Sequence, residues 1–298
     1  MHIDDLSAAL SNWEQRIESV EKLAGGWNSS VWLVRSESGV RYVAKLADTH
    51  DADAFRGGLR SAALAASHGF PSGPPVPTRD GRIAMKLAEG FLALLEYIPG
   101  RTGDASSEED VRRMGATLAR AHQALQDDTG GMSEQFIWPW RWADACLENL
   151  TMPEEVQSAA VRVLDRAREI SSDVPIRIGV VHGDPGLDSF RLHDESPLRD
   201  GLIDWSATME APILYDLGSF AVMTRGAPQM LQYFLSGYLE VTPELSDEVK
   251  YLDAFIKLRW MCNAIYFSAR ISRGIVRGVN SAADNERGLM EAYAGMVR

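Results

Sequence analysis

Two aspartates in the second half of the sequence follow short apolar stretches. Asp184 closes the tripeptide His182-Gly183-Asp184, and Asp204 follows 20 residues later in Ile203-Asp204-Trp205. Two carboxylates at the ends of strands can face one cleft. Phosphoryl transfer requires such a pair, because one carboxylate orients the attacking hydroxyl and the other holds the magnesium that bridges the nucleotide phosphates. The tripeptide alone is equally compatible with a turn capped by an aspartate, so its meaning depends on the rest of the chain.

A lysine in the first half of the chain is a candidate phosphate ligand. Lys45 lies within Tyr42-Val43-Ala44-Lys45-Leu46, whose aromatic and β-branched residues predict a strand. A charge among apolar neighbours needs a partner or an anionic ligand, unless the alternation of the strand turns it to solvent. The upstream segment Gly25-Gly26-Trp27-Asn28-Ser29-Ser30 allows backbone N–H groups to approach phosphate oxygens. We therefore expect a phosphate-covering loop with Gly25, Gly26 and Ser29 as nucleotide ligands.

The elements that must position these residues are mostly strands at first. Apolar residues at helical spacing predict helices at 6–20 and 53–67. Short stretches rich in β-branched and aromatic residues predict antiparallel strands at 30–35, 40–46, 82–87 and 91–97. A small antiparallel sheet with one main helix is therefore complete by about residue 97.

Beyond Pro99-Gly100 the pattern becomes mainly helical. Helices are predicted at 111–125, 154–170, 213–223, 248–271 and 283–296. One β-rich island interrupts them, with strands at 176–181, 190–192 and 201–205. The sequence thus predicts an α+β fold with a sheet lobe at residues 1–97 and a larger helical lobe at residues 98–298.

Composition excludes several classes of protein. The 298 residues are 45% hydrophobic and 24% charged, as in soluble globular proteins, and no apolar run approaches the roughly 18 residues of a membrane-spanning helix. A net charge of −12 disfavours nucleic acid and anionic lipid as partners and weakly favours a cationic substrate. The N-terminus resembles no secretory signal, so we expect a cytoplasmic protein. Monomer and homodimer stay equally open.

Taken in order, these segments resemble the aminoglycoside phosphotransferase and choline kinase family of protein-kinase-like enzymes. The matching segments are Gly25-Gly26, Lys45, residues 95–100, residues 114–122, His182-Gly183-Asp184, Ile203-Asp204-Trp205 and Tyr215-Asp216-Leu217. The resemblance implies a two-lobed kinase-like fold and ATP as phosphoryl donor with magnesium, GTP being the alternative nucleotide. It also implies a small-molecule hydroxyl as acceptor, an antibiotic or a metabolite. Only five residues separate Trp205 from Ala211-Pro212, which leaves no room for the activation loop of a protein kinase.

The resemblance implies a role for each matched position. Asp184 would orient the acceptor hydroxyl, and Asp204 would bind the metal. Lys45 would contact the α- and β-phosphates. Adenine would be received by backbone groups at Glu96, Tyr97 and Ile98.

Further polar and aromatic residues are expected either to support the structure or to hold the acceptor. His182 and Asp216 are expected to support the catalytic loop structurally. Residues 138–142, Trp-Pro-Trp-Arg-Trp, are expected to pack within the helical lobe more readily than to stack on an acceptor. Candidates for holding a cationic acceptor are Asp144, Glu148, Glu210 and Asp253.

The chain departs from the family pattern in three respects, one of which is the bulky Trp27 in the loop before the hairpin. The asparagine that normally supplies the second metal ligand is replaced by Ser189, with Asp188 as the alternative ligand. No glutamate lies between residues 49 and 68 to pair with Lys45, which leaves Asp53, another acid or the nucleotide alone. These departures motivate a second hypothesis, a non-catalytic or weakly active nucleotide-binding relative with a degenerate metal site.

Overall fold

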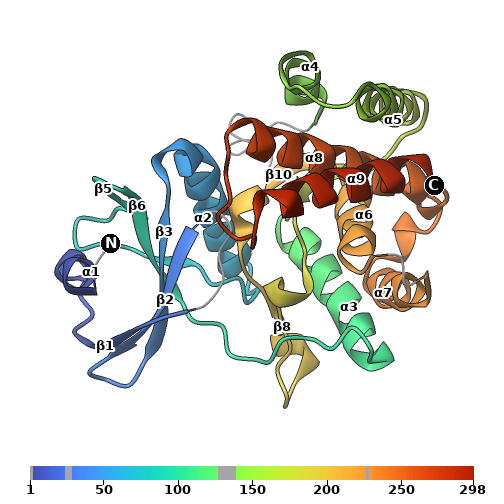
Figure 1. The fold of residues 1–298 in the computed structure, drawn as a ribbon. Helices are drawn as coiled ribbons and strands as arrows, with labels where there is room; N and C mark the ends of the chain where they lie inside the picture. Colours follow the sequence, from blue (N-terminus) through green and yellow to red (C-terminus); the bar gives the residue numbers. More distant parts are fainter. Residues whose placement is uncertain (1–2, 24–28, 127–138, 226–227) are drawn as a thin grey trace.

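The computed structural model of the chain describes residues 3–23, 29–126, 139–225 and 228–298. Over these residues an antiparallel sheet is followed by a larger, mostly helical part (Figure 1). The predicted α+β class is confirmed. None of the helices within the described ranges combines the length and apolar composition that crossing a membrane requires.

The sheet contains strands in the order β1-β2-β3-β6-β4, and β5 pairs with β6. Every pairing is antiparallel. The strands are β1 (Ile17–Lys22), β2 (Ser29–Ser36), β3 (Arg41–Ala47), β4 (Pro75–Val76), β5 (Met85–Leu87) and β6 (Gly90–Glu96). The predicted hairpin and the predicted pair of later strands are therefore confirmed, the first strand of that pair being shorter than predicted.

Helices cover the two faces of this sheet. Side chains of β3 that include Ala44 and Leu46 pack with α1 (Ile3–Leu10) in one apolar cluster. Ala47 packs with α2 (Ala52–Ser67) in another. Because residues alternate between the faces of a strand, Lys45 lies on the α2 side. In Figure 1, α2 stands between the sheet and the helical part, so this face is the inner one.

The prediction of one helix over residues 6–20 is wrong in its second half. The helix α1 ends at Leu10, and β1 starts at Ile17. Ile17 and Val20 are three residues apart, yet both pack on the same cluster, because the β1–β2 register shifts between Ile17 and Ser19. A β-bulge of this kind gives a strand the spacing of a helical stripe.

The helical part is built around one large apolar core. Its helices are α3 (Glu108–Ala124), α4 (Pro139–Asn149), α5 (Glu154–Asp173), α6 (Leu214–Met223), α7 (Pro228–Val241), α8 (Leu252–Ser272) and α9 (Ala282–Val297). Each predicted helix after residue 100 is confirmed within a few residues. The helices α4 and α7 have no counterpart among the predicted ones.

Two short β-ladders form the island within the helices. β7 (Ile178–Val181) pairs with β10 (Met209–Pro212), and β8 (Phe190–Arg191) pairs with β9 (Gly201–Leu202), both antiparallel. The strand predicted at 201–205 stops at Leu202, and β10 was not predicted. Asp204 lies two residues beyond β9 with a left-handed backbone, φ 68° and ψ 59°. Such a conformation is uncommon for an aspartate and occurs often at functional sites.

Candidate active site

One buried carboxylate anchors the loop that carries Asp184. Asp216, in the first turn of α6, accepts hydrogen bonds from the backbone N–H groups of His182 (2.7 Å) and Gly183 (2.8 Å). The ring of His122 on α3 lies 2.9 Å from the same carboxylate and 2.8 Å from the hydroxyl of Tyr238. The expectation that Asp216 supports the loop is confirmed. The part played by His122 was not predicted, although it ends one of the segments that match the family.

The same loop is joined to the loop that follows Asp204. The ring Nε2 of His182 lies 3.0 Å from the carbonyl of Ile203, and the ring packs against Trp205 with 4.9 Å between centroids. Gly183 has φ +85°, and a Cβ there would lie 2.0 Å from the carbonyl oxygen of Ala207. Only glycine permits this contact. His182 is therefore structural, as expected, and the loops bearing Asp184 and Asp204 touch.

Lys45 crosses from the sheet to Asp204. Its Nζ donates to Asp204 Oδ1 at 2.5 Å and to Ser206 Oγ at 3.1 Å. The residue is only 8% exposed, so the alternative that the strand turns it to solvent is wrong. Burial opposes ionisation of Asp204, but the charge and hydrogen bond of Lys45 outweigh it and lower the pKa of Asp204 to about 2. The carboxylate is therefore anionic at neutral pH.

Asp204 itself takes the place of the missing glutamate. The alternative partner Asp53 is exposed on the first turn of α2. At Gly58 the same helix packs so closely on the loop after Asp204 that a Cβ would lie 2.3 Å from the carbonyl oxygen of Trp205. No side chain larger than the hydrogen of glycine fits at position 58 without a shift of the helix or the loop. In place of the glutamate of the family pattern, the helix thus offers a closely packed surface.

The residues around Asp204 fit a metal ion shared with a nucleotide. Lys45 and Ser206 both donate hydrogen bonds to Oδ1 of Asp204. Oδ2 makes no hydrogen bond with the described residues. Ser189 is buried, and its carbonyl accepts the N–H of Ile203, the neighbour of Asp204; Asp188 is exposed. Among the described residues no group of three or more His, Cys, Asp or Glu could hold a metal. Magnesium commonly uses one or two carboxylates and completes its shell with phosphates and water, so one carboxylate beside a serine is a suitable set.

The segment expected to receive adenine connects the sheet to the helical part. The N–H of Glu96 already donates to the carbonyl of Pro74 at 2.9 Å. The ring of Tyr97 carries the guanidinium of Arg41 4.0 Å above its centroid. Ile98 is half-buried where this segment meets β9. The Glu96 N–H is thus occupied, and the backbone groups of Tyr97 and Ile98 are the ones left for a ligand.

The expected phosphate-covering loop is described only at its end. Ser29 is buried at the start of β2, whereas Gly25-Gly26 lie outside the described residues. Arg277, in the connection between α8 and α9, donates to Asp48 at 2.8 Å and lies 3.5 Å from the hydroxyl of Ser30. The helical part therefore contacts the sheet beside the loop (Figure 1).

Arg259 on α8 contacts Asp184 and was not predicted. Its Nη2 donates to Asp184 Oδ1 at 2.8 Å, and only 11% of its side chain is exposed. Burial opposes the charge, but Tyr215 and Asp184 raise the pKa of Arg259 above its ordinary value. The one available signal was its place on the buried stripe of α8, between Phe255 and Cys262.

Of the four acids considered for acceptor binding, Asp144 and Asp253 are in ion pairs, whereas Glu148 and Glu210 are exposed. Trp142 is half-buried against the helical core, as expected for packing, and the side chains of residues 138–141 lie outside the described part. Asp144 accepts from Arg168 at 2.5 Å, and Asp253 pairs with Lys257 at 2.9 Å. The structure gives no special support to an acidic acceptor pocket built from these groups.

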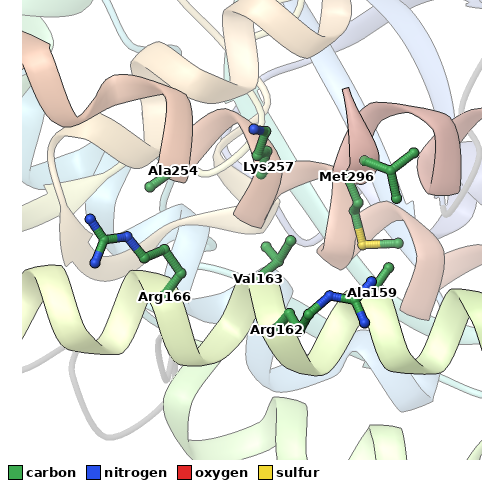
Figure 2. A pocket seen from close by; sticks show the side chains of 8 residues that line it. Ala159, Arg162, Val163, Arg166, Ala254, Lys257 and Met296 are labelled. Carbon is green, nitrogen blue, oxygen red and sulfur yellow. The ribbon is translucent and has the colours of Figure 1, made fainter.

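A cavity of about 300 Å³ lies among α5, α8 and α9 (Figure 2). It is lined by Ala159, Arg162, Val163, Arg166, Ala254, Lys257, Met296 and Val297. Arg166 pairs with Glu169 at 3.1 Å, and Lys257 pairs with Asp253. None of the predicted site residues lines this cavity.

Comparison with known proteins gives a consistent assignment. Residues 19–249 match the phosphotransferase enzyme family. The chain is 27% identical over 201 residues to a homoserine kinase of Methylobacillus flagellatus, a match that spans 66% of this chain and 61% of that protein. An amicoumacin kinase in complex with AMP-PNP and Ca²⁺ has a TM-score of 0.75 at 17% identity, with 99% of this chain and 92% of that one covered.

Aminoglycoside 2'-phosphotransferase-IIIa, solved as a GDP complex, has a TM-score of 0.69 at 14% identity, with 98% of each chain covered. The kinase-like fold and the resemblance inferred from the sequence are therefore confirmed. The family match covers most of the chain and includes the loops of Asp184 and Asp204. The chain belongs to the phosphotransferase enzyme family.

Proposed function

We propose that the protein transfers the γ-phosphoryl group of ATP to a hydroxyl of a small molecule, with magnesium as the metal. The observation that carries this proposal is the meeting of Lys45, Asp204 and Asp184. Lys45 and Asp204 form an ion pair between the sheet and the helical part, and the loop of Asp184 touches the loop of Asp204. Phosphoryl transfer needs positioning and charge neutralisation more than covalent chemistry, and these three residues supply both.

The nucleotide is assigned to residues 1–97 and the acceptor, catalytic loop and metal to residues 98–298. Lys45 contacts the α- and β-phosphates, and Gly25, Gly26 and Ser29 cover them. Adenine lies against the backbone of Tyr97 and Ile98, because the Glu96 N–H is occupied. GTP is the alternative donor, since the aminoglycoside 2'-phosphotransferase was solved with GDP.

Magnesium is assigned to Asp204 and Ser189, with Asp188 as the less favourable candidate because it is exposed. When bound there, the metal would neutralise charge on the nucleotide phosphates. The use of a divalent ion is supported by the Ca²⁺ and AMP-PNP in the amicoumacin kinase structure. Lys45 must exchange its bond to Asp204 for a phosphate oxygen as the nucleotide enters.

The acceptor is a small hydroxylated molecule. Relatives include kinases of homoserine, an amino acid, and of antibiotics. A metabolite and an antibiotic are both consistent with these similarities, and antibiotic resistance follows only in the second case. We place the reaction in the cytoplasm.

A second candidate is a nucleotide-binding relative without efficient transfer. Ser189 stands where an asparagine is expected, and Lys45 has no partner on α2 among the described residues. A degenerate site would bind nucleotide without regard to magnesium.

Asparagine at position 184 tests the transfer reaction. Asp184→Asn keeps the shape of the side chain but cannot accept the acceptor proton, so we expect turnover to fall by about a hundredfold or more. The measurement is ADP release with a panel that contains homoserine, choline and aminoglycosides. Glu195→Gln, at an exposed acid further along the same segment and outside the proposed site, is the matched control for lost charge. Near-normal turnover of Asp184→Asn on the true acceptor would contradict the proposal.

A further inference from the structure

We infer that Arg259 is a positioning residue that fixes the carboxylate of Asp184 and leaves one of its oxygens for the acceptor hydroxyl. The inference rests on the proposed function, in which Asp184 orients that hydroxyl. Arg259 Nη2 donates to Oδ1 of Asp184 at 2.8 Å, and among the described residues Oδ2 has no recorded partner. The Asp184 side chain is 48% exposed, so its second oxygen is open to a ligand.

Arg259 and Asp184 share one hydrogen bond, and this single bond favours the positioning role. Arginine and a carboxylate commonly form two parallel hydrogen bonds, which would occupy both oxygens of Asp184. Here Nε of Arg259 is buried and makes no hydrogen bond with the described residues. A single bond from Nη2 therefore holds Oδ1 and spares Oδ2, at the expense of one unsatisfied buried N–H.

Arg259 is itself held firmly. Its Nη1 donates to Oδ1 of Asn263, one turn further along α8. Tyr215 is buried and lies close enough to raise the pKa of Arg259. The guanidinium thus has contacts on several sides, and little freedom to leave Asp184. A rigid support of this kind is what a precisely aimed catalytic carboxylate requires.

The inference predicts an effect on turnover and not on binding. Because Arg259 contacts the carboxylate and not the acceptor, Arg259→Gln is expected to lower kcat about tenfold to a hundredfold, the range that a misplaced catalytic group produces. The KM values for nucleotide and acceptor should stay within about threefold of wild type. Arg259→Lys keeps the charge and one donor, and should recover part of the loss.

Lys257 provides a matched control on the same helix. It lies two residues earlier, points toward the cavity of Figure 2 and pairs with Asp253. Lys257→Gln removes the same charge from α8 without touching Asp184. Its kcat should equal that of the wild type.

The decisive experiment is a double-mutant cycle of Asp184→Asn and Arg259→Gln, with steady-state kinetics on the acceptor identified by the ADP-release panel and AMP-PNP titration as the check of folding. If Arg259 acts through Asp184, the double variant is as slow as Asp184→Asn alone. An additive double variant, a normal kcat for Arg259→Gln, or a raised acceptor KM with unchanged kcat would each overturn the inference. Should Arg259→Gln fail to bind AMP-PNP, the kcat of Arg259→Lys decides, because wild-type turnover there overturns the inference and a partial loss supports it. Normal turnover of Asp184→Asn would instead overturn the proposed function.

Discussion

At the scale of single residues, the buried carboxylate of Asp216 does more for the site than any group expected to touch a substrate. It accepts from two consecutive backbone N–H groups, those of His182 and Gly183, and contacts the ring of His122. These contacts tie α3, α6 and the catalytic loop to one point. The position of Asp184 therefore depends on a buried residue of α6 that holds the backbone just before it.

Replacing Asp216 by asparagine should destabilise the protein strongly. One carboxylate oxygen becomes an NH₂ group that faces N–H donors, so at least one buried hydrogen bond is lost and a repulsive contact replaces it. We expect a loss of about 2 to 4 kcal/mol in the free energy of unfolding, measured by urea denaturation. A loss below 0.5 kcal/mol, roughly the value for an uninvolved surface substitution, would contradict this account of the loop.

The residues that the structure brings together around Asp204 were largely predictable because their types and order are restrictive. His182-Gly183-Asp184, Asp204 and Lys45 could be found from sequence, since a charged residue after or within an apolar stretch needs a reason. Arg259 could not be assigned, because only the fold brings α8 to the catalytic loop. The family pattern gave no substitute for the missing glutamate, since the pairing of Lys45 with Asp204 joins residues 159 positions apart.

At the scale of elements, α2 and the loop after Asp204 pack closely against each other. Gly58 allows the helix to lie directly on the carbonyl of Trp205. The helix therefore fixes the position of Asp204 relative to β3, the strand that carries Lys45. Close packing replaces the salt bridge that a glutamate on this helix would provide.

A single methyl group at this contact should disturb the site. In Gly58→Ala the new Cβ would stand 2.3 Å from a backbone oxygen, so the helix or the loop has to move. We expect the free energy of unfolding to fall by about 1 to 3 kcal/mol, despite the higher helix propensity of alanine. Arg60→Ala, at an exposed position of the same helix, should change stability by less than about 0.5 kcal/mol. Thermal and urea unfolding compare the two, and a stabilised Gly58→Ala would refute the contact.

Element types were predictable where the period of apolar residues was long and regular. The helices α3, α5, α8 and α9 follow such patterns over many turns. The first segment misled because a bulge in β1 mimics helical spacing, and sequence alone does not show that β2 offers a hydrogen-bonding partner. β10 was missed because its four residues include Pro212 and pair only with β7.

At the scale of the whole molecule, an ion pair lies where the chain passes from the sheet to the helical part. Arg101 follows the turn after β6 and donates to both oxygens of Asp110 in α3, at 2.5 and 2.7 Å. Asp110 also accepts the backbone N–H of Asp104 at 2.8 Å. Hydrogen bonds from Arg101, acting against burial, lower the pKa of Asp110. This pair holds the start of the helical part against the segment that leaves the sheet.

The lowered pKa gives a pH-dependent contribution to stability. Ionised Asp110 stabilises the fold fully above the ordinary carboxyl pKa of 3.8, and this contribution is lost as the pH falls through the lower native pKa. Asp110→Asn should therefore be less stable by about 2 kcal/mol at pH 7, with a smaller difference at pH 3. Urea unfolding at both pH values measures it. An equal difference at the two pH values would show that the charge is irrelevant.

The order of the lobes could be read from the shift in composition after residue 97, and the family resemblance supplied their arrangement. The contact of Arg277 with Asp48 joins the two parts but could not be foreseen, since it depends on how far the connection between α8 and α9 reaches. The identity of the acceptor could not be predicted for the same reason. Side chains from different helices come to face one another only after folding.

We expect Asp204 to complete a working site for a metal and a nucleotide. Calorimetric titration of AMP-PNP into the wild type and Asp204→Asn, each with and without magnesium, tests it without knowledge of the acceptor. We expect magnesium to tighten binding to the wild type at least about tenfold and to have little effect on the variant, because the ion loses its charged protein ligand. Wild-type binding that is absent or indifferent to magnesium would contradict the account and support a degenerate site.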